Sequence, residues 1–392
     1  MDRHPRPDHL QRRHQQPHPS LLHRGHLAMK YGTGRSRMGG FGLLELMLAA
    51  ALGLIVVAGV IVIFVAQRQV YNNSSSQSLI QDSDNAIAAL VTPVVRGAGF
   101  TGCGTIGNGV ISSISSPATP LTFNANSTVQ GYTGTMPASL VDNAGDDSTA
   151  SDWTPSLDAS ITTASNGGPE QGSDVLVVIG AAQNASPIGV TAPITGSPIA
   201  VNDTTQLEAI NGGGAQMVAV SDCSKSTIFM ATGIGSDSVA FSSGPGSTPS
   251  YQANSQLIPV QQTVFFVAKG DGGQSALWQG VMTLPAGATT AAGAAWKMNE
   301  MVPGVAAMKV LYGIGAGGDE TAGQYVDASE VSDWSQVTSV KLGFVVEGGL
   351  GSATVPPAAW SYTLFGKTVS MPADSRMRHV FYLTVNTRNT TL

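Results

Sequence analysis

The sequence predicts an α+β protein, with one long N-terminal helix followed by a domain built mainly from antiparallel strands. An almost unbroken apolar run of 26 residues, from Phe41 to Ala66, predicts the first half of the helix. Short apolar runs separated by Gly-rich turns predict the strands, and all of them follow the helix. With 47 glycines and only 11% charged residues, the composition is typical of a loop-rich exported domain rather than a cytosolic enzyme.

The apolar run is long enough to cross a membrane. As a helix it would extend about 39 Å, against a hydrocarbon core of roughly 30 Å. Arg35 and Arg37 precede the run, which predicts a single-pass segment with its N-terminus in the cytoplasm and the following domain across the membrane. Glu45 is the only ionisable residue in the run. Because a carboxylate in the membrane is costly, Glu45 is expected to make a functional contact.

The helix is expected to continue beyond the membrane as an amphipathic segment. Pro93 and the run 97–99 are expected to end or kink it. Asp82, Asp84 and Asn85 are expected to face solvent. The apolar face, expected to lie across a β-sheet, consists of Ile80, Ile87, Leu90, Val91 and Val94.

Strand signals are strongest after residue 172. The runs 263–268 and 276–281 flank a Gly-rich turn and predict a hairpin. Further strands are expected at 175–179, 217–220, 228–230, 305–312, 337–346 and 380–387. Residues 102–172 predict short strands and surface loops. Four aspartates there do not have EF-hand spacing, so a solvated loop is favoured over calcium: Asp142, Asp146, Asp147 and Asp152.

The first 40 residues differ from the rest in charge. They hold eight of the 19 basic and two of the 25 acidic residues, which leaves 11 basic and 23 acidic residues, a net −12, after Gly40. So acidic a domain is a poor candidate for direct nucleic-acid binding. Residues 1–28 contain six of the seven histidines. A start of translation at Met29 is preferred to a metal-binding tail, and either way the segment is removed with the leader.

The two cysteines, Cys103 and Cys223, both fall in the exported part. An even pair in an oxidising compartment predicts one disulfide, with two buried free thiols as the alternative. The bond would close a loop of about 120 residues and stabilise the fold by about 2–4 kcal/mol.

Signatures of catalysis are scarce. His379 is the only histidine after Gly40, and no nucleophile elbow accompanies it. Asp319 and Glu320 lie in a Gly-rich segment and are interpreted as a solvated turn. No phosphate-binding loop and no C-x-x-C motif occur. The sequence therefore predicts a non-catalytic protein without cofactor or metal.

The start of the apolar run resembles the class III signal of type IV prepilins. In that family a basic leader ends in Gly, the mature chain begins with Phe, and its fifth residue is Glu. Gly40, Phe41 and Glu45 hold these positions, while Gly42 departs from the usual Thr or Ser. The alternative is a plain single-pass anchor with an incidental glutamate.

Blocks along the mature chain resemble the PilW family of minor pilins. Such proteins are similar to the J-type pseudopilins of type II secretion. These blocks include both cysteines, and they are 96–103, 172–176, 220–224, 302–313, 333–337 and 378–389. The resemblance implies a type IV pilin-like fold and a structural role in priming pilus assembly at the tip, with downstream roles in twitching motility, attachment or DNA uptake.

The resemblance also implies the processing and the partners. Prepilin peptidase would cleave between Gly40 and Phe41 and methylate the new amino group of Phe41. Glu45 and the amine of Phe41 would dock neighbouring subunits by pairing a carboxylate with an ammonium group. Ala49 and Gly53 have a spacing that allows close helix contact, although ordinary use of small residues explains it equally well. The implied partners are other minor pilins, the major pilin, a tip adhesin and the inner-membrane assembly platform.

The expected organisation is a leader at 1–40, a pilin helix at 41–96 whose part 41–66 is membrane anchor and later filament core, and a β-rich domain at 97–392. The chain is expected in the inner membrane with a periplasmic domain, and then in the pilus at the cell surface. One alternative function is a J-type pseudopilin, which neighbouring genes would identify. Another is a membrane-anchored periplasmic enzyme or binding protein, which predicts an uncleaved N-terminus.

Overall fold

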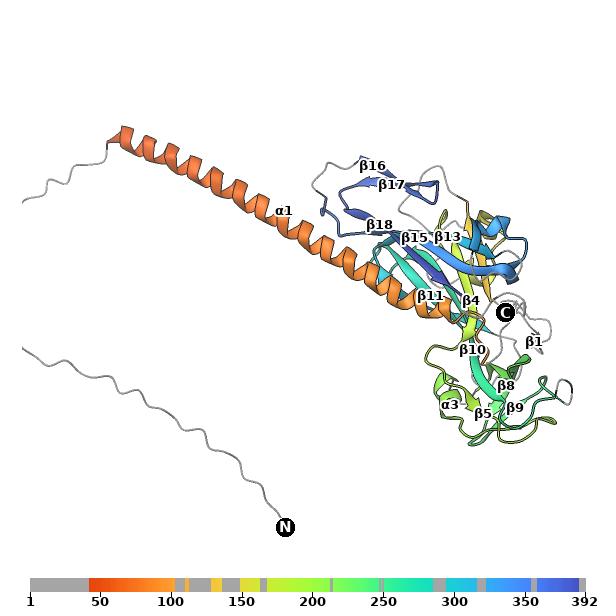
Figure 1. Cartoon of the computed structure of the whole chain (residues 1–392). Helices are drawn as coiled ribbons and strands as arrows, with labels where there is room; N and C mark the ends of the chain where they lie inside the picture. Colours follow the sequence, from red (N-terminus) through yellow and green to blue (C-terminus); the bar gives the residue numbers. More distant parts are fainter. Residues whose placement is uncertain are drawn as a thin grey trace, which may run out of the picture. The chain divides into compact units, whose positions relative to one another are not determined.

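A computed structural model describes residues 42–102, 110–112, 128–135, 149–162, 168–211, 214–246, 248, 250–284, 294–315, 322–353 and 358–387. Its order of elements confirms the α+β prediction: a long helix, α1 (Leu43–Arg96), precedes a domain of mainly antiparallel strands (Figure 1). The chain divides into two compact units, Met1–Ile61 and Val62–Leu392.

The described part of the first unit is the apolar half of α1. The amides of Glu45 and Leu46 both donate to the carbonyl of Gly42, which closes the first turn. Every described side chain up to Ile61 is exposed. By length and composition, α1 is the one helix among the described residues that could cross a membrane.

In the second unit, α1 continues to Arg96 and packs against the strands. Pro93 lies within the helix instead of ending it, and the last turn closes through a bond from the Gly97 amide to the Pro93 carbonyl. The chain then reverses at Gly99, whose φ of 76° falls in the left-handed region that favours glycine. The predicted end of the helix near residue 96 is therefore confirmed.

The strands of the second unit form two larger sheets and a separate hairpin. One sheet has 12 strands, with β10 (Gln256–Lys269) at its centre. Its other members are β1 (Val110–Ser112), β2 (Val129–Gly134), β3 (Trp153–Thr154), β4 (Val175–Ala181), β5 (Ile188–Gly189), β6 (Ile199–Ala200), β7 (Gln216–Ser221), β8 (Ser226–Ile234), β9 (Ser238–Phe241), β11 (Ser275–Thr283) and β12 (Ala295–Pro303). Its pairings are antiparallel except for β1 with β8.

The second sheet has four antiparallel strands in the order β14 (Ala322–Val326), β13 (Val305–Gly315), β15 (Val337–Glu347) and β18 (Arg378–Asn386). A separate hairpin consists of β16 (Ala358–Leu364) and β17 (Lys367–Asp374). Five short helices complete the described part: η1 (Ala150–Asp152), α2 (Ala159–Thr162), α3 (Thr205–Asn211), η2 (Ala328–Glu330) and η3 (Trp334–Gln336).

Strand β10 explains how one sheet extends over so much of the domain. Its first residues, Gln256–Pro259, pair with β7, while the later residues pair with β4 on one side and β11 on the other. The predicted hairpin at 263–268 and 276–281 is confirmed as β10 and β11, with Gly273 at a φ of 80° in the turn. The strand is longer than predicted because Gln261 and Gln262 interrupt the apolar pattern without interrupting the pairing.

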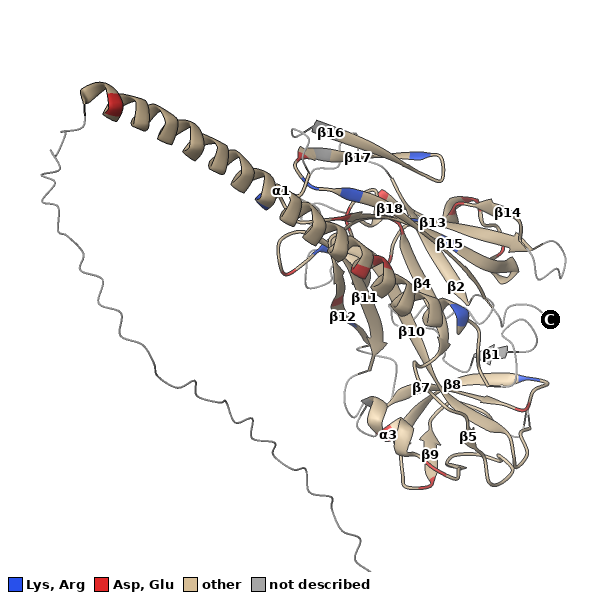
Figure 2. Cartoon of the chain, turned by 60° about the vertical axis from the view of Figure 1, so that its left-hand side comes forward, with Lys and Arg blue, Asp and Glu red and all other residues tan. Residues whose placement is uncertain are grey.

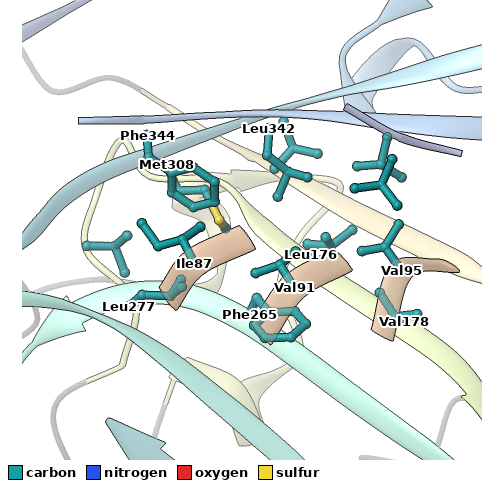
Figure 3. Close-up of a cluster of buried hydrophobic side chains, with 14 of the residues drawn as sticks. Ile87, Val91, Val95, Leu176, Val178, Phe265, Leu277, Met308, Leu342 and Phe344 are labelled. Carbon is teal, nitrogen blue, oxygen red and sulfur yellow. The ribbon is translucent and has the colours of Figure 1, made fainter. Parts of the chain in front are cut away.

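The main core lies where α1 passes between the two sheets. Ile87, Val91 and Val95 are fully buried. Figure 3 shows them between Leu342 and Phe344 of the four-stranded sheet and Phe265, Leu176 and Val178 of the 12-stranded sheet. The prediction that this half of the helix lies across a sheet is confirmed, and a second sheet covers its other side. This double cover explains why Val95, absent from the predicted face, is buried.

Candidate functional site

The predicted processing site cannot be placed, because Gly40 and Phe41 lie outside the described residues. Glu45 lies in the first turn of α1, where the ribbon is red in Figure 2. Its side chain is exposed and makes no ion pair within the described part of the chain. The carboxylate is thus available to a group from another molecule, and its docking role stays a prediction.

The rest of the apolar half of α1 is also uncovered. Leu43, Leu54 and Val62 are each more than 65% exposed. Gly53 has open space where a Cβ would stand, and Ala49, one turn earlier, is exposed as well. An apolar helix without a covering element needs lipid or other helices around it, and the small residues would let another helix approach closely. This surface can therefore serve both anchoring and helix-to-helix packing.

Where α1 meets the domain, Asp84 corrects an expectation from the sequence. It was predicted to face solvent, but it is half-buried, and its Oδ2 lies 3.4 Å from Nδ1 of His379 at the start of β18. Burial raises the pKa of the Asp84 carboxyl, and the nearby His379 opposes that rise. The spacing of the apolar residues predicted an exposed side of α1 at Asp84, but the four-stranded sheet covers that side. Asp82 and Asn85 are exposed, as predicted.

The end of α1 is held close to strand β4. The Gly99 amide donates to the Ile179 carbonyl, and Ala98 forms a bridge with Gly180. A Cβ added at Gly180 would lie 2.2 Å from the carbonyl oxygen of Gly97, so only glycine allows this approach. The junction is thus backbone against backbone, which fixes where the helix ends on the sheet.

A buried ion pair joins the two sheets. Nζ of Lys309 in β13 lies 2.9 Å from Oδ1 of Asp174, which immediately precedes β4, and both side chains are 2% exposed. Asp174 also accepts bonds from the amides of Gly134 and Val310, while Lys309 donates to the Gly134 carbonyl. Removing one partner of such a pair leaves the other charge buried and unpaired, which destabilises the fold by about 3–5 kcal/mol. Sequence reasoning missed this contact, although a Lys inside an apolar strand is a visible signal.

A second ionic cluster closes the end of the four-stranded sheet. Arg378 contacts both Glu347 and Asp374, and Arg376 contacts Glu347 and Gln274. Burial raises the pKa of Glu347 although both arginines oppose it. Since Asp374 ends β17 and Gln274 precedes β11, the cluster ties the hairpin and the 12-stranded sheet to β15 and β18. Its groups are paired with each other, which points to a structural role.

The cysteine region is described on one side only. Cys103 lies outside the described residues, and Cys223 has a φ of 69° in the turn between β7 and β8. Burial alone would raise the pKa of Asp222, but hydrogen bonds from Lys225 and Ser224 lower it to about 2 and hold this turn.

The residues before Cys103 approach the same turn. Thr101 donates to Ser226 at 3.1 Å, and a Cβ at Gly102 would lie 3.3 Å from Cβ of Ser221. Thr101 and Gly102 therefore lie beside the turn that contains Cys223. The pairing of Cys103 with Cys223 stays a prediction.

The described residues contain no group of three or more His, Cys, Asp or Glu side chains placed to hold a metal ion. Nδ1 of His379 contacts the half-buried Asp84. Asp319 and Glu320 lie outside the described part.

Residues 264–389 match the family described as Type IV Pilus-assembly protein W. The match begins within β10 and extends through the whole four-stranded sheet to the end of β18, and it confirms the PilW resemblance over that part. A comparison with curated proteins found no match. Among solved structures, a type IV-like pilin from Thermus thermophilus is 19% identical with a TM-score of 0.21, over 48% of this chain and 94% of that chain.

Proposed function

We propose that this chain, which matches the PilW family over residues 264–389, is a minor pilin that helps prime assembly of the type IV pilus. One observation carries the proposal: an exposed apolar helix with a carboxylate in its first turn continues without a break into the core of a β-rich domain. An apolar helix that continues into an exported domain suits a subunit whose anchor and domain leave the membrane together.

Maturation is the first step of the proposed role. Prepilin peptidase hydrolyses the peptide bond between Gly40 and Phe41 and methylates the amine of Phe41. The chain then stands in the inner membrane by the segment 41–66, with residues 97–392 in the periplasm. The leader 1–40 is lost, and with it the histidine-rich stretch.

Docking is the second step. In the membrane, the carboxylate of Glu45 has no partner within its own described helix, and an unpaired charge there is unfavourable. The ammonium group of another subunit's N-terminus would neutralise it, and the amine of Phe41 would meet a carboxylate in turn. Such pairing sets the axial register at which subunits add, in an initiation complex with other minor pilins beneath a tip adhesin.

The test is deletion of the gene in a piliated host, followed by complementation with the intact chain. A priming role predicts that surface pili and twitching motility are lost and then restored, while secretion through the type II system is unchanged. Normal piliation with defective secretion would instead indicate a pseudopilin. Normal behaviour of both systems would contradict an assembly role.

A further inference from the structure

Two adjoining pockets lie in the second unit beside the end of α1. One has a volume of about 270 Å³ and the other about 490 Å³. They share four lining residues, Ala182, Ile210, Gln261 and Val281, and therefore form one continuous groove. Pro93, Val94 and Gly97 of the helix end line the larger pocket, so the groove runs along the side of α1.

The floor of the groove is the helix-facing side of the 12-stranded sheet beyond the part that α1 covers. In the antiparallel ladder, Gln279 stands opposite Asn299 and Val281 stands opposite Lys297. Residues directly opposite in such a ladder share a face, so β11 and β12 present these four side chains together. Gln261 of β10 adds a third amide.

Two polar side chains of the groove, Gln216 and Thr283, donate to backbone carbonyls, while four others make no such bond within the described residues. The amides of Gln261, Gln279 and Asn299 make no hydrogen bond there, and Lys297 makes no ion pair. Ile210, 45% exposed, adds an apolar side chain at the edge.

The charge of the groove differs from that of the chain around it. No acidic residue lines either pocket, although the chain after Gly40 has a net charge of −12. The groove therefore carries the positive charge of Lys297 and several amide side chains on an otherwise acidic protein, and these groups are complementary to a carboxylate.

We propose that this groove binds an extended acidic segment of a different pilus subunit; the idea rests on the proposed function. A carboxylate of that segment pairs with Lys297, and a neighbouring apolar side chain packs on Ile210 and Val281. The amide side chains of Gln279 and Asn299 can donate to peptide carbonyls and accept from peptide N–H groups, which an extended chain supplies in alternation. A duplex nucleic acid would instead be repelled by the acidic protein around the groove.

The experiment places a photo-cross-linking amino acid, benzoylphenylalanine, at the exposed Asn299 of the full chain in piliated cells. The cross-linked peptide is then identified by mass spectrometry. We expect a different pilus subunit, linked within a few residues of an Asp or Glu. Lys297→Glu should lower the yield about tenfold, as for a charge pair lost at an interface. Lys269→Glu, the same charge change at an exposed position outside the groove, should leave the yield within about twofold.

The proposal would be overturned by no cross-link, by a link to a second copy of this chain, or by a yield that Lys297→Glu does not lower. A linked peptide without an acidic residue would do the same. The photo-cross-linker at Val60, on the exposed apolar half of α1, separates this failure from that of the proposed function. If Val60 links to other pilin helices and Asn299 does not link, only the groove proposal fails. If Val60 links to no subunit, the minor-pilin role itself fails.

Discussion

At the scale of single residues, Glu45 bears most of the assembly hypothesis. An ionised carboxylate in a helix that is otherwise apolar stabilises nothing within its own described segment, so its benefit must come from a partner. The neighbouring positions in the first turn, Leu43 and Leu46, are exposed and apolar, which leaves Glu45 as the only polar contact that this turn can offer.

Glu45→Ala is expected to leave cleavage of the leader intact. It should reduce incorporation of the chain into pili at least about tenfold, because losing a buried charge pair costs more than about 1.4 kcal/mol, and 1.4 kcal/mol corresponds to a factor of ten. Immunoblots of the membrane and of sheared pili measure the two steps separately. Gln69→Ala, at an exposed polar position of the same helix, is the matched control and should behave like the unmodified chain. Unchanged piliation in Glu45→Ala would contradict the docking role.

Asp222 should make stability depend on acidity at low pH. Its pKa is about 2 in the folded chain against 3.8 when unperturbed, so the folded state binds the proton less tightly than the unfolded state. The resulting stabilisation is fully present above pH 3.8 and is lost as pH falls through 2. Because the pair with Lys225 lies at the surface, with side chains 30% and 24% exposed, solvent screening keeps the effect below about 1 kcal/mol.

Urea unfolding of the full chain in detergent at pH 4 and pH 2 measures this dependence. Asp222→Asn should reduce the stability difference between the two pH values, while Asp82→Asn, at an exposed helix position, should preserve it. If the stability difference between pH 4 and pH 2 is the same in the unmodified chain and in Asp222→Asn, other carboxyl groups cause the loss of stability at low pH.

The sequence alone identifies residues whose role is visible from their immediate neighbours in the chain. Glu45 is visible because its neighbours are all apolar, and the turn at Gly273 because glycines cluster there. The pair of Asp174 and Lys309 spans 135 positions in the chain, and no local pattern identifies which buried lysine meets which carboxylate. Gly180 is required by the approach of Gly97, which depends on the tertiary fold alone.

At the scale of elements, α1 is the part whose packing can be tested most simply. Ile87 is fully buried between the two sheets, so Ile87→Ala should leave a cavity and lower the free energy of unfolding by about 2–5 kcal/mol. Leu79→Ala, on the same helix but 55% exposed, should change it by less than about 0.5 kcal/mol. Chemical denaturation in detergent gives both values. Equal effects of the two substitutions would contradict the burial of the helix between the sheets.

The elements that could be predicted are those with strong periodic or continuous apolar signals. The expected runs at 175–179 and 337–346 became β4 and β15 with bounds shifted by two residues at most. Strand β12 was missed because lysine, asparagine and glutamate interrupt its apolar positions. Its alternation, with Trp296 and Met298 on one face and Lys297 and Asn299 on the other, was a usable signal. The hairpin of β16 and β17 was also missed, because serine and threonine alternate with its apolar residues.

At the scale of the whole molecule, an apolar helix and a β-rich domain belong to one chain. The match to the PilW family covers the four-stranded sheet, while the prepilin-like signal lies at the other end of the chain. The two signals are independent, since they fall on residues more than 200 positions apart. An enzyme or binding protein held by a plain anchor would need an apolar helix and a folded domain, but no cleavage at Gly40.

The intact mass of the chain recovered from sheared pili tests the central claim most directly. The minor-pilin hypothesis predicts a species that begins at Phe41 and carries a single added methyl group. A chain that retains residues before Phe41, or one found in the membrane and never in the sheared pili, would contradict it.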